Sequence, residues 1–477
     1  MRDINIKFFI GLSLLLVIIR LLFISNTLLI NDEAYYAIYA RHLAWGYVDH
    51  GPIIAYLIKF FTLIWENSFT VRLGATTLMS VLTIILYYFG KKYFNSQTGV
   101  LLSLSLTANM LFHTNSIVIT PDVPMTFFTI LAMMFYYLSY CVDKKYIYIG
   151  GGMLGLAVLS KISALFPAIG IALYPILIKE KRHWLKNIHY YGSFTLAFLI
   201  FLPFIIWNFQ NDFAFVLNQG SHIYRGGGIG HFINLWLGIA VISGPLFFYF
   251  SVIKPFINLK RWKNLSDSIQ FFTIVTIVPL SYFLGHSLFS KFELNWPAPV
   301  FLSGLFLFAL QIKNTQKRFY YAQIIYSLLL IILITVQTFK PILPLKGDSD
   351  ITNRYYMYDG FLNELNKFLN QNPELRNTRI AANNFQIPSM INFYLKPSLE
   401  ATCLSIGYQE TLYSFLYPNI SQKYDDFIFI KHGMGYPKFL DNYFSEILPL
   451  KEFKVRRADQ ILSNFSLWHV KNFSGEK

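Results

Sequence analysis

Charged residues are scarce in this chain of 477 residues: only 14% are charged, while 55% are hydrophobic and 18% are aromatic. An ordinary soluble protein carries about a quarter charged residues. The shortage excludes a conventional water-soluble protein and indicates a chain that needs lipid around it. Cysteine is rarer still, with Cys141 closing an apolar run and Cys403 in the C-terminal region. Two cysteines so placed predict no disulfide framework.

Acidic residues are few as well, 25 against 40 basic ones, which gives a formal net charge of +15. A basic chain can bind nucleic acid, but these lysines and arginines form short clusters between apolar runs instead of one continuous face. The clusters therefore indicate membrane topology, and we expect no nucleic-acid partner. The sequence also lacks an internal repeat and a low-complexity tract.

Long apolar runs are what the chain has in abundance. Runs of about 20 residues, long enough to cross about 30 Å of hydrocarbon, recur until about residue 338 and then stop. The first, Phe8–Ile30, is too long for a signal peptide and lacks a cleavage site, so we expect a retained helix. The pattern predicts an α-helical polytopic membrane protein with about eleven transmembrane helices, near residues 8–29, 70–90, 98–118, 123–141, 146–161, 163–178, 190–208, 232–253, 269–288, 297–312 and 319–338.

Basic clusters mark one side of the predicted membrane domain. They lie between the expected helices at Lys91–Lys92, Lys144–Lys145, Lys179–Lys186, Lys254–Lys263 and Lys313–Arg318. The positive-inside rule makes this side cytoplasmic and sends the other connections outward. We expect a transmembrane domain over residues 1–339 and an extracytoplasmic α/β domain over residues 340–477, with strand-like segments at Arg379–Asn384, Asp426–Lys431 and Ile461–Val470.

Residues 30–69, the first outward connection, are amphipathic, aromatic and broken by Gly51-Pro52. We expect two helices lying along the membrane interface, where an enzyme would meet a lipid-linked substrate. A plain connecting loop is the alternative.

Acidic side chains stand on two of the outward segments. Asp32 and Glu33 form an adjacent pair at the end of the first helix, where one carboxylate can deprotonate an acceptor hydroxyl and the other can bind a metal or orient the acceptor. Asp122 opens the fourth helix after Thr120-Pro121. A solvated acidic pair and a simple helix cap are the alternatives.

Other polar side chains share the predicted outward side. Asp49 and His50 add a carboxylate and an imidazole, and Lys161 interrupts an apolar stretch where its ammonium can meet a phosphate or snorkel to the interface. Arg225, before Gly226-Gly227-Gly228, can also bind phosphate.

A last outward segment holds Lys291, Glu293 and Asn295 ahead of Trp296-Pro297. Lys291 and Glu293 can instead pair with each other. Because the topology came from the inward clusters alone, the gathering of all these groups on the opposite side predicts one extracytoplasmic polar site.

Six segments in the same order give the chain a family resemblance. It resembles the dolichyl-phosphate-mannose protein mannosyltransferase-like family through Asn31-Asp32-Glu33-Ala34-Tyr35-Tyr36, Gly46-Tyr47-Val48-Asp49-His50-Gly51-Pro52, Thr120-Pro121-Asp122-Val123-Pro124, Leu159-Ser160-Lys161, Trp207-Asn208-Phe209-Gln210-Asn211-Asp212 and Asn295-Trp296-Pro297-Ala298-Pro299. The family belongs to the GT-C glycosyltransferases, and its bacterial branch includes the aminoarabinose transferases that modify lipid A.

The resemblance implies inverting sugar transfer from undecaprenyl phosphate to lipid A or another envelope glycolipid, outside the bacterial inner membrane. It implies Asp32 as the base, Glu33 as its acidic partner and Asp122 as the second acidic motif. A divalent metal held by Glu33, Asp122 and His50 is possible, and we expect no organic cofactor. His50-Gly51-Pro52 stands where aminoarabinose transferases have Lys-Pro-Pro, so the resemblance carries over neither the aminoarabinose substrate nor a lysine phosphate ligand at this place, and Lys161, Arg225 and Lys291 are the better phosphate candidates.

Two other functions stay open at this stage. A protein O-glycosyltransferase would use the same donor and would need the C-terminal domain or outward loops to bind peptide. A transporter or flippase would carry ionisable residues near the bilayer midplane in paired halves, whereas here they gather at one end.

Overall fold

The computed structural model describes residues 6–223, 226–312, 317–406, 410–418, 420 and 424–473. Contacts within the chain divide it into two compact units. The first comprises Met1–Phe23, His50–Leu57 and Arg72–Leu333. The second comprises Ile24–Asp49, Ile58–Val71 and Ile334–Lys477. The second unit therefore takes in much of the first outward connection, which the sequence analysis had assigned to the transmembrane domain.

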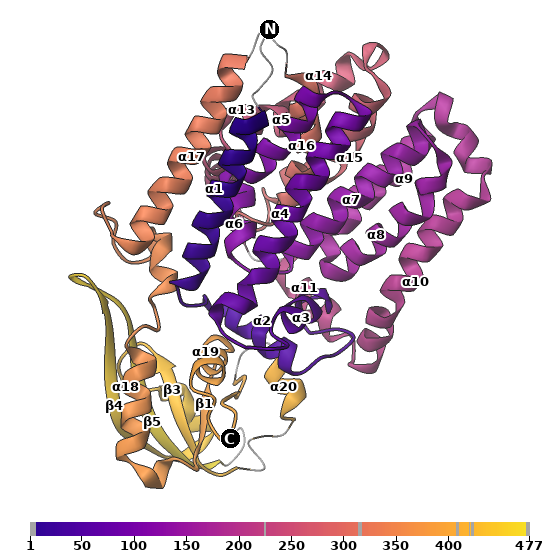
Figure 1. The fold of residues 1–477 in the computed structure, drawn as a ribbon. Coiled ribbons are helices and arrows are strands. Elements are labelled where there is room, and N and C mark those ends of the chain that lie inside the picture. Colours follow the sequence, from indigo (N-terminus) through magenta and orange to yellow (C-terminus); the bar gives the residue numbers. More distant parts are fainter. Residues whose placement is uncertain are drawn as a thin grey trace. The chain divides into compact units, whose positions relative to one another are not determined.

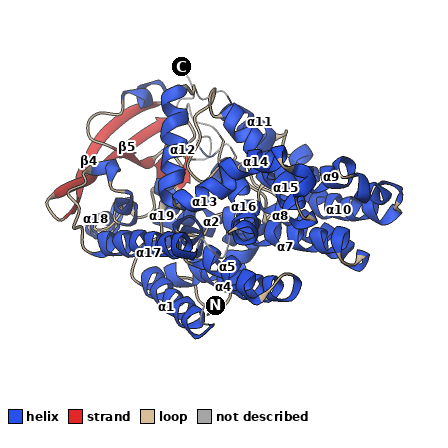
Figure 2. Ribbon diagram, turned by 90° about the horizontal axis from the view of Figure 1, so that it is seen from above, coloured by secondary structure: helices blue, strands red, loops and turns tan. Residues whose placement is uncertain are grey.

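The described part of the first unit is helical (Figure 2). Four of its helices, α1, α3, α4 and α17, continue into the second unit. The helices are α1 (Ile6–Ser25), α3 (Ile53–Phe61), α4 (Ser68–Tyr93), α5 (Ser96–Thr107), α6 (Met110–Ile117), α7 (Asp122–Cys141), α8 (Ile147–Ser160), α9 (Leu165–Leu177), α10 (Ile188–Gln210), α11 (Ala214–Ile223), α12 (Ile229–Ser243), α13 (Pro245–Phe248), a π-helical turn (Tyr249–Ile253), α14 (Lys254–Lys260), α15 (Asp267–His286), α16 (Ala298–Gln311) and α17 (Lys317–Phe339).

Among the described residues, six helices are long and apolar enough to cross a membrane, and eight if each of two bent pairs forms one span. The expectation of about eleven was too high. Helices occur in every predicted region, but α8 and α16 have 14 residues each, about 21 Å at 1.5 Å per residue. The predicted helix at 98–118 is two, because Asn109 caps α6 through the N–H of Leu111 while the Arg20 guanidinium binds the carbonyl of Thr107 at the end of α5.

Small residues bring α8 and α10 together within the first unit (Figure 1). A Cβ added to Gly151 would lie 2.3 Å from the carbonyl oxygen of Ser193, and one added to Gly155 would lie 2.8 Å from that of Ala197. Glycines four residues apart let two membrane helices approach closely. The sequence Gly151-x-x-x-Gly155 therefore determines how α8, which ends just before Lys161, packs against α10.

Buried polar bonds join two helix breaks in the same unit. Asn109, between α5 and α6, donates to the carbonyl of Ser243 at 2.7 Å, and Gln323 of α17 donates to the same oxygen at 2.9 Å. The Gln323 oxygen accepts the N–H of Leu246 in α13 at 3.2 Å. Backbone groups freed by a break inside a membrane protein need such partners.

The second unit contains a mixed five-stranded sheet in the order β2-β1-β3-β5-β4. Strand β1 runs parallel to β2 and β3, while β5 runs antiparallel to β3 and β4. The unit's elements are α2 (Asn31–Arg41), α18 (Phe361–Gln371), β1 (Arg379–Ala382), α19 (Gln386–Tyr394), β2 (Thr402–Cys403), α20 (Leu412–Leu416), β3 (Phe427–His432), β4 (Phe444–Arg457) and β5 (Gln460–Phe473). The predicted C-terminal α/β region is thus confirmed, and its three expected strands are β1, β3 and β5.

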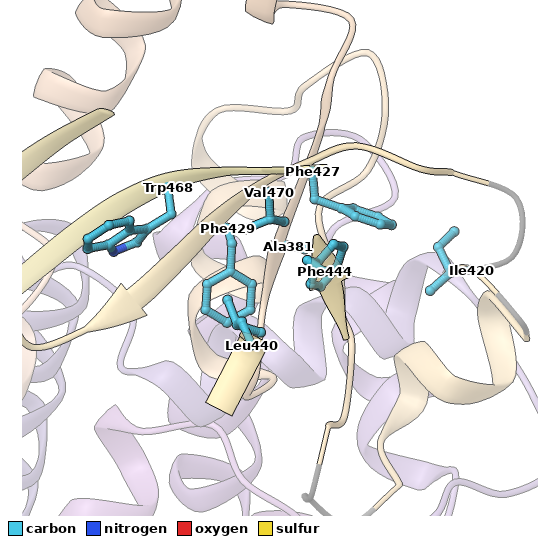
Figure 3. Close-up of a cluster of buried hydrophobic side chains, with 8 residues drawn as sticks. All are labelled: Ala381, Ile420, Phe427, Phe429, Leu440, Phe444, Trp468 and Val470. Atoms are coloured by element: carbon cyan, nitrogen blue, oxygen red, sulfur yellow. The ribbon is translucent and has the colours of Figure 1, made fainter. Parts of the chain in front are cut away.

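A cluster of buried apolar side chains forms the core on the sheet (Figure 3). It consists of Ala381, Ile420, Phe427, Phe429, Leu440, Phe444, Trp468 and Val470. Strands β2 and β4 were not predicted. Strand β2 has only two residues, and β4 reads as a loop because Pro449 and many charged residues interrupt it. Such residues are typical of a strand at the edge of a sheet, which is where β4 lies.

Two helices occur in residues 30–69, as expected: α2 and α3. The alternative of a plain connecting loop is wrong. Eight of the eleven residues of α2 are buried, including Tyr35 and Tyr39, because this helix packs against α19 within the second unit. That the two helices lie along a membrane interface stays a prediction.

Candidate active site

The two adjacent carboxylates at the start of α2 have different surroundings. Glu33 is fully buried, and its carboxylate accepts the backbone N–H of Ile30 at 2.9 Å, just ahead of the helix. Asp32 is exposed. Since the first N–H groups of a helix lack partners within it, Glu33 is engaged in holding the helix start. Asp32 is the carboxylate that a reactant can reach.

Asp49 lies in the same unit and is partly buried. Its carboxylate accepts a hydrogen bond from the hydroxyl of Tyr39, whose ring stacks on Tyr47 at 3.8 Å between centroids. Burial raises the pKa of Asp49 to about 6; the bond from Tyr39 opposes this rise and the charge of Asp32 adds to it. The sequence analysis missed Tyr39, although its spacing of four residues from Tyr35 places both on one helix face.

Asp122, Lys161 and Asn295 form one bonded group in the first unit. The Lys161 ammonium donates to both oxygens of Asp122, at 2.8 and 2.9 Å, and the side-chain amide of Asn295 donates to Oδ2 at 2.9 Å. Asp122 is 4% exposed. Asp122 makes no side-chain cap hydrogen bond, but it lies in the first turn of α7, where its charge complements the helix dipole. Snorkelling does not describe Lys161, since its ammonium is held by this buried carboxylate.

His50 and Gly51 pack against the end of the helix that leads to Lys161. His50 is partly buried, and a Cβ added to Gly51 would lie 1.8 Å from the carbonyl oxygen of Leu159. Only glycine fits this approach of the two backbones. The glycine at this position therefore has a local physical reason.

The glycine-rich loop is attached to the segment that leads to Lys291. The N–H of Gly227 donates to the carbonyl of Phe289 at 3.0 Å, and a Cβ on Gly227 would lie 2.5 Å from the nitrogen of Ser290. Lys291 and Glu293 are both exposed, and the structure, which describes both, has no ion pair between them. Arg225 lies outside the described residues.

The residues expected to hold a metal do not form a set of ligands within either unit. The Asp122 oxygens already accept from an ammonium and an amide, and the Glu33 carboxylate accepts from the backbone. Among the described residues, no group of three or more His, Cys, Asp or Glu side chains is placed to hold a metal ion. A metal requirement stays a prediction.

Known proteins resemble this chain in part of its sequence and in its fold. Residues 49–207 match the model of the family described as dolichyl-phosphate-mannose-protein mannosyltransferase. The fold is similar to crystal structures of ArnT from Cupriavidus metallidurans, one in the apo state (TM-score 0.67, 12% identity) and one bound to undecaprenyl phosphate (TM-score 0.64, 14% identity). Each likeness covers 97% of both chains. No match was found among curated protein sequences.

The family match spans the turn at Asp49-His50, the start of α7 at Asp122 and the Lys161 break. The shared fold extends over the remaining helices and the C-terminal sheet. Residues 49–207 are therefore similar to a family of membrane glycosyltransferases, and the whole chain has the fold of the two ArnT structures.

Proposed function

We propose that this protein transfers a sugar from undecaprenyl phosphate to lipid A or another envelope glycolipid, on the outer side of a bacterial inner membrane. One observation carries the donor: the fold matches, over 97% of both chains, a protein whose crystal structure holds undecaprenyl phosphate. The basic clusters on the opposite side of the predicted membrane domain support the orientation.

In the proposed reaction Asp32 is the general base. Its exposed carboxylate takes the proton of the acceptor hydroxyl, and the acceptor oxygen then bonds to the anomeric carbon of the sugar. The bond from that carbon to the phosphate oxygen breaks, and undecaprenyl phosphate leaves with the electron pair. A single displacement inverts the anomeric centre.

A cation has to stabilise the charge that develops on the departing phosphate. Lys291 is the first choice among the described candidates, because it is exposed and pairs with no carboxylate of the described residues, whereas Lys161 is held by Asp122. We assign Asp122, fixed by Lys161 and Asn295, to orienting the donor sugar through its remaining lone pairs. His50 and Asp49 stay candidates for acceptor contacts.

A carrier-release assay tests the proposal. Purified protein in lipid nanodiscs receives lipid A and a panel of undecaprenyl-phosphate sugars, and mass spectrometry measures released undecaprenyl phosphate together with the glycosylated acceptor. Asp32→Asn should lower turnover at least 100-fold and leave undecaprenyl phosphate binding unchanged. Asp359→Asn is the matched control, since Asp359 is also an exposed aspartate near a helix start and lies two residues ahead of α18. Full turnover by Asp32→Asn would exclude Asp32 as the base.

Protein O-glycosylation is the second candidate, and the description of the matching family favours it. The same assay separates the two acceptors when a serine- and threonine-rich peptide replaces lipid A. Sugar on the peptide and none on lipid A would establish protein glycosylation. Repeating the assay with EDTA tests the predicted metal.

A further inference from the structure

The start of the helix that carries Asp32 is held by a tyrosine from far along the chain. The backbone N–H of Leu29, just ahead of α2, donates to the hydroxyl of Tyr394 at 2.8 Å. The next N–H, that of Ile30, is held by Glu33 of α2 itself. Tyr394 is the last residue of α19. Because Asp32 is the second residue of α2, these two consecutive bonds fix the backbone that places its carboxylate.

The end of α2 is held by α19 and by Glu66, which lies between α3 and α4 and is itself bound by Lys396 of the C-terminal region. Arg41 donates through Nε and Nη2 to the two oxygens of Glu66, at 2.9 and 2.7 Å, and through Nη1 to the carbonyl of Asn392 in α19 at 3.0 Å. Lys396 reaches Glu66 at 2.9 Å. A two-pronged arginine–carboxylate contact restricts orientation as well as distance, and the bond to Asn392 links the far end of α2 to α19.

The middle of α2 is held by a buried tyrosine. The hydroxyl of Tyr35 accepts the N–H of Leu412 at the start of α20 at 2.8 Å, and its ring lies 4.2 Å from that of Phe385. Tyr35 is 1% exposed. Helices α2 and α19 lie side by side along this contact (Figures 1 and 2).

We propose that the C-terminal region positions the base of the reaction, and that Tyr394 is its principal positioning residue. The inference rests on the proposed function, in which Asp32 is that base. A domain that served only to bind the acceptor would not need polar bonds to the start, middle and end of the helix bearing Asp32. All the groups involved lie in the second unit.

Loss of the Tyr394 hydroxyl frees the Leu29 N–H and lets the start of α2 shift, while the ring keeps its packing. A misplacement of about 1 Å can cost about 100-fold in rate. For Tyr394→Phe we expect kcat to fall 10- to 100-fold in the carrier-release assay. The affinity for undecaprenyl phosphate, measured on the same nanodiscs, should stay within about twofold, since Tyr394 makes no proposed contact with the carrier.

Tyr436→Phe is the matched control, because the Tyr436 hydroxyl bonds Asp441 in the same region and touches nothing on α2. It should keep wild-type kcat. Glu66→Gln, which weakens the contact at the other end of α2, should also lower kcat without changing carrier affinity. Turnover is expressed per molecule that binds undecaprenyl phosphate, so that misfolded protein is not counted.

Three results decide the matter. If Tyr394→Phe keeps more than half of the wild-type kcat while Asp32→Asn is inactive, the positioning role is refuted and the proposed function stands. If the rate falls only in step with the fraction that binds carrier, Tyr394 is merely structural and the inference is again refuted. If Asp32→Asn itself retains turnover, the proposed base is wrong whatever Tyr394→Phe does.

Discussion

Replacing Lys161 by Met tests whether the pair with Asp122 is a buried structural ion pair. The two side chains are 14% and 5% exposed, and two hydrogen bonds join them. Removing one partner of a buried pair leaves an uncompensated charge, which costs about 3–5 kcal/mol. That is a change of about two to four powers of ten in the unfolding equilibrium. Reversible unfolding in mixed dodecyl maltoside and SDS micelles measures it.

Two further variants complete the experiment. In Lys161→Met with Asp122→Asn no charge is left unpaired, and Asn295 keeps an acceptor, so we expect most of the lost stability to return. Lys145→Met is the matched control, because Lys145 pairs with Asp143 at the same 2.8 Å but at an exposed site, where pairs contribute little. A loss below about 1 kcal/mol for Lys161→Met would refute the buried pair. Weaker undecaprenyl phosphate binding by Lys161→Met would instead indicate that Lys161 binds the carrier phosphate.

Two more predictions concern packing and pH. Gly51→Ala should lower the thermal unfolding temperature and turnover, because its Cβ would lie 1.8 Å from the Leu159 carbonyl oxygen. Gly152→Ala is the control and should leave both unchanged, since nothing lies within 4 Å of its Cβ. Equal unfolding temperatures for the two variants would contradict this. The hydrogen bond from His42 lowers the pKa of Glu400 to about 2, so this carboxylate stabilises the fold above its unfolded pKa of about 4.3 and loses that effect as the pH falls toward 2. Glu400→Gln should therefore be less stable than wild type at pH 7 and approach it near pH 2.5, as measured by unfolding across that range.

The membrane helices were predictable because long apolar runs are visible in the sequence, but the number of membrane spans was not. Whether a run crosses the membrane depends on where it breaks, and the breaks come from contacts between distant residues. Thr107 ends α5 under the guanidinium of Arg20, 87 residues away. The carbonyl of Ser243, at the end of α12, is bonded by Asn109, which is 134 residues away.

In the candidate site, too, the single residues were predictable from the sequence and the contacts between them were not. The sequence singled out Asp122, Lys161 and Asn295 separately, since polar groups in membrane proteins are seldom idle. Their mutual bonding joins positions 39 and 173 residues apart, and no local pattern encodes it. Tyr394 carried no signal at all, because a tyrosine at the end of a mostly buried helix looks like any other packing residue.

The bond between Leu29 and Tyr394 joins residues 365 positions apart, and this separation has a consequence in time. A ribosome adds about 5–20 residues per second, so roughly 20–70 seconds pass between the synthesis of α2 and that of its partner helix. During that interval Tyr35 lacks Phe385 and Leu412, its contacts in the C-terminal region. The segment that holds α2 has to be shielded, by lipid or by a chaperone, until α19, in the last fifth of the protein, has been made.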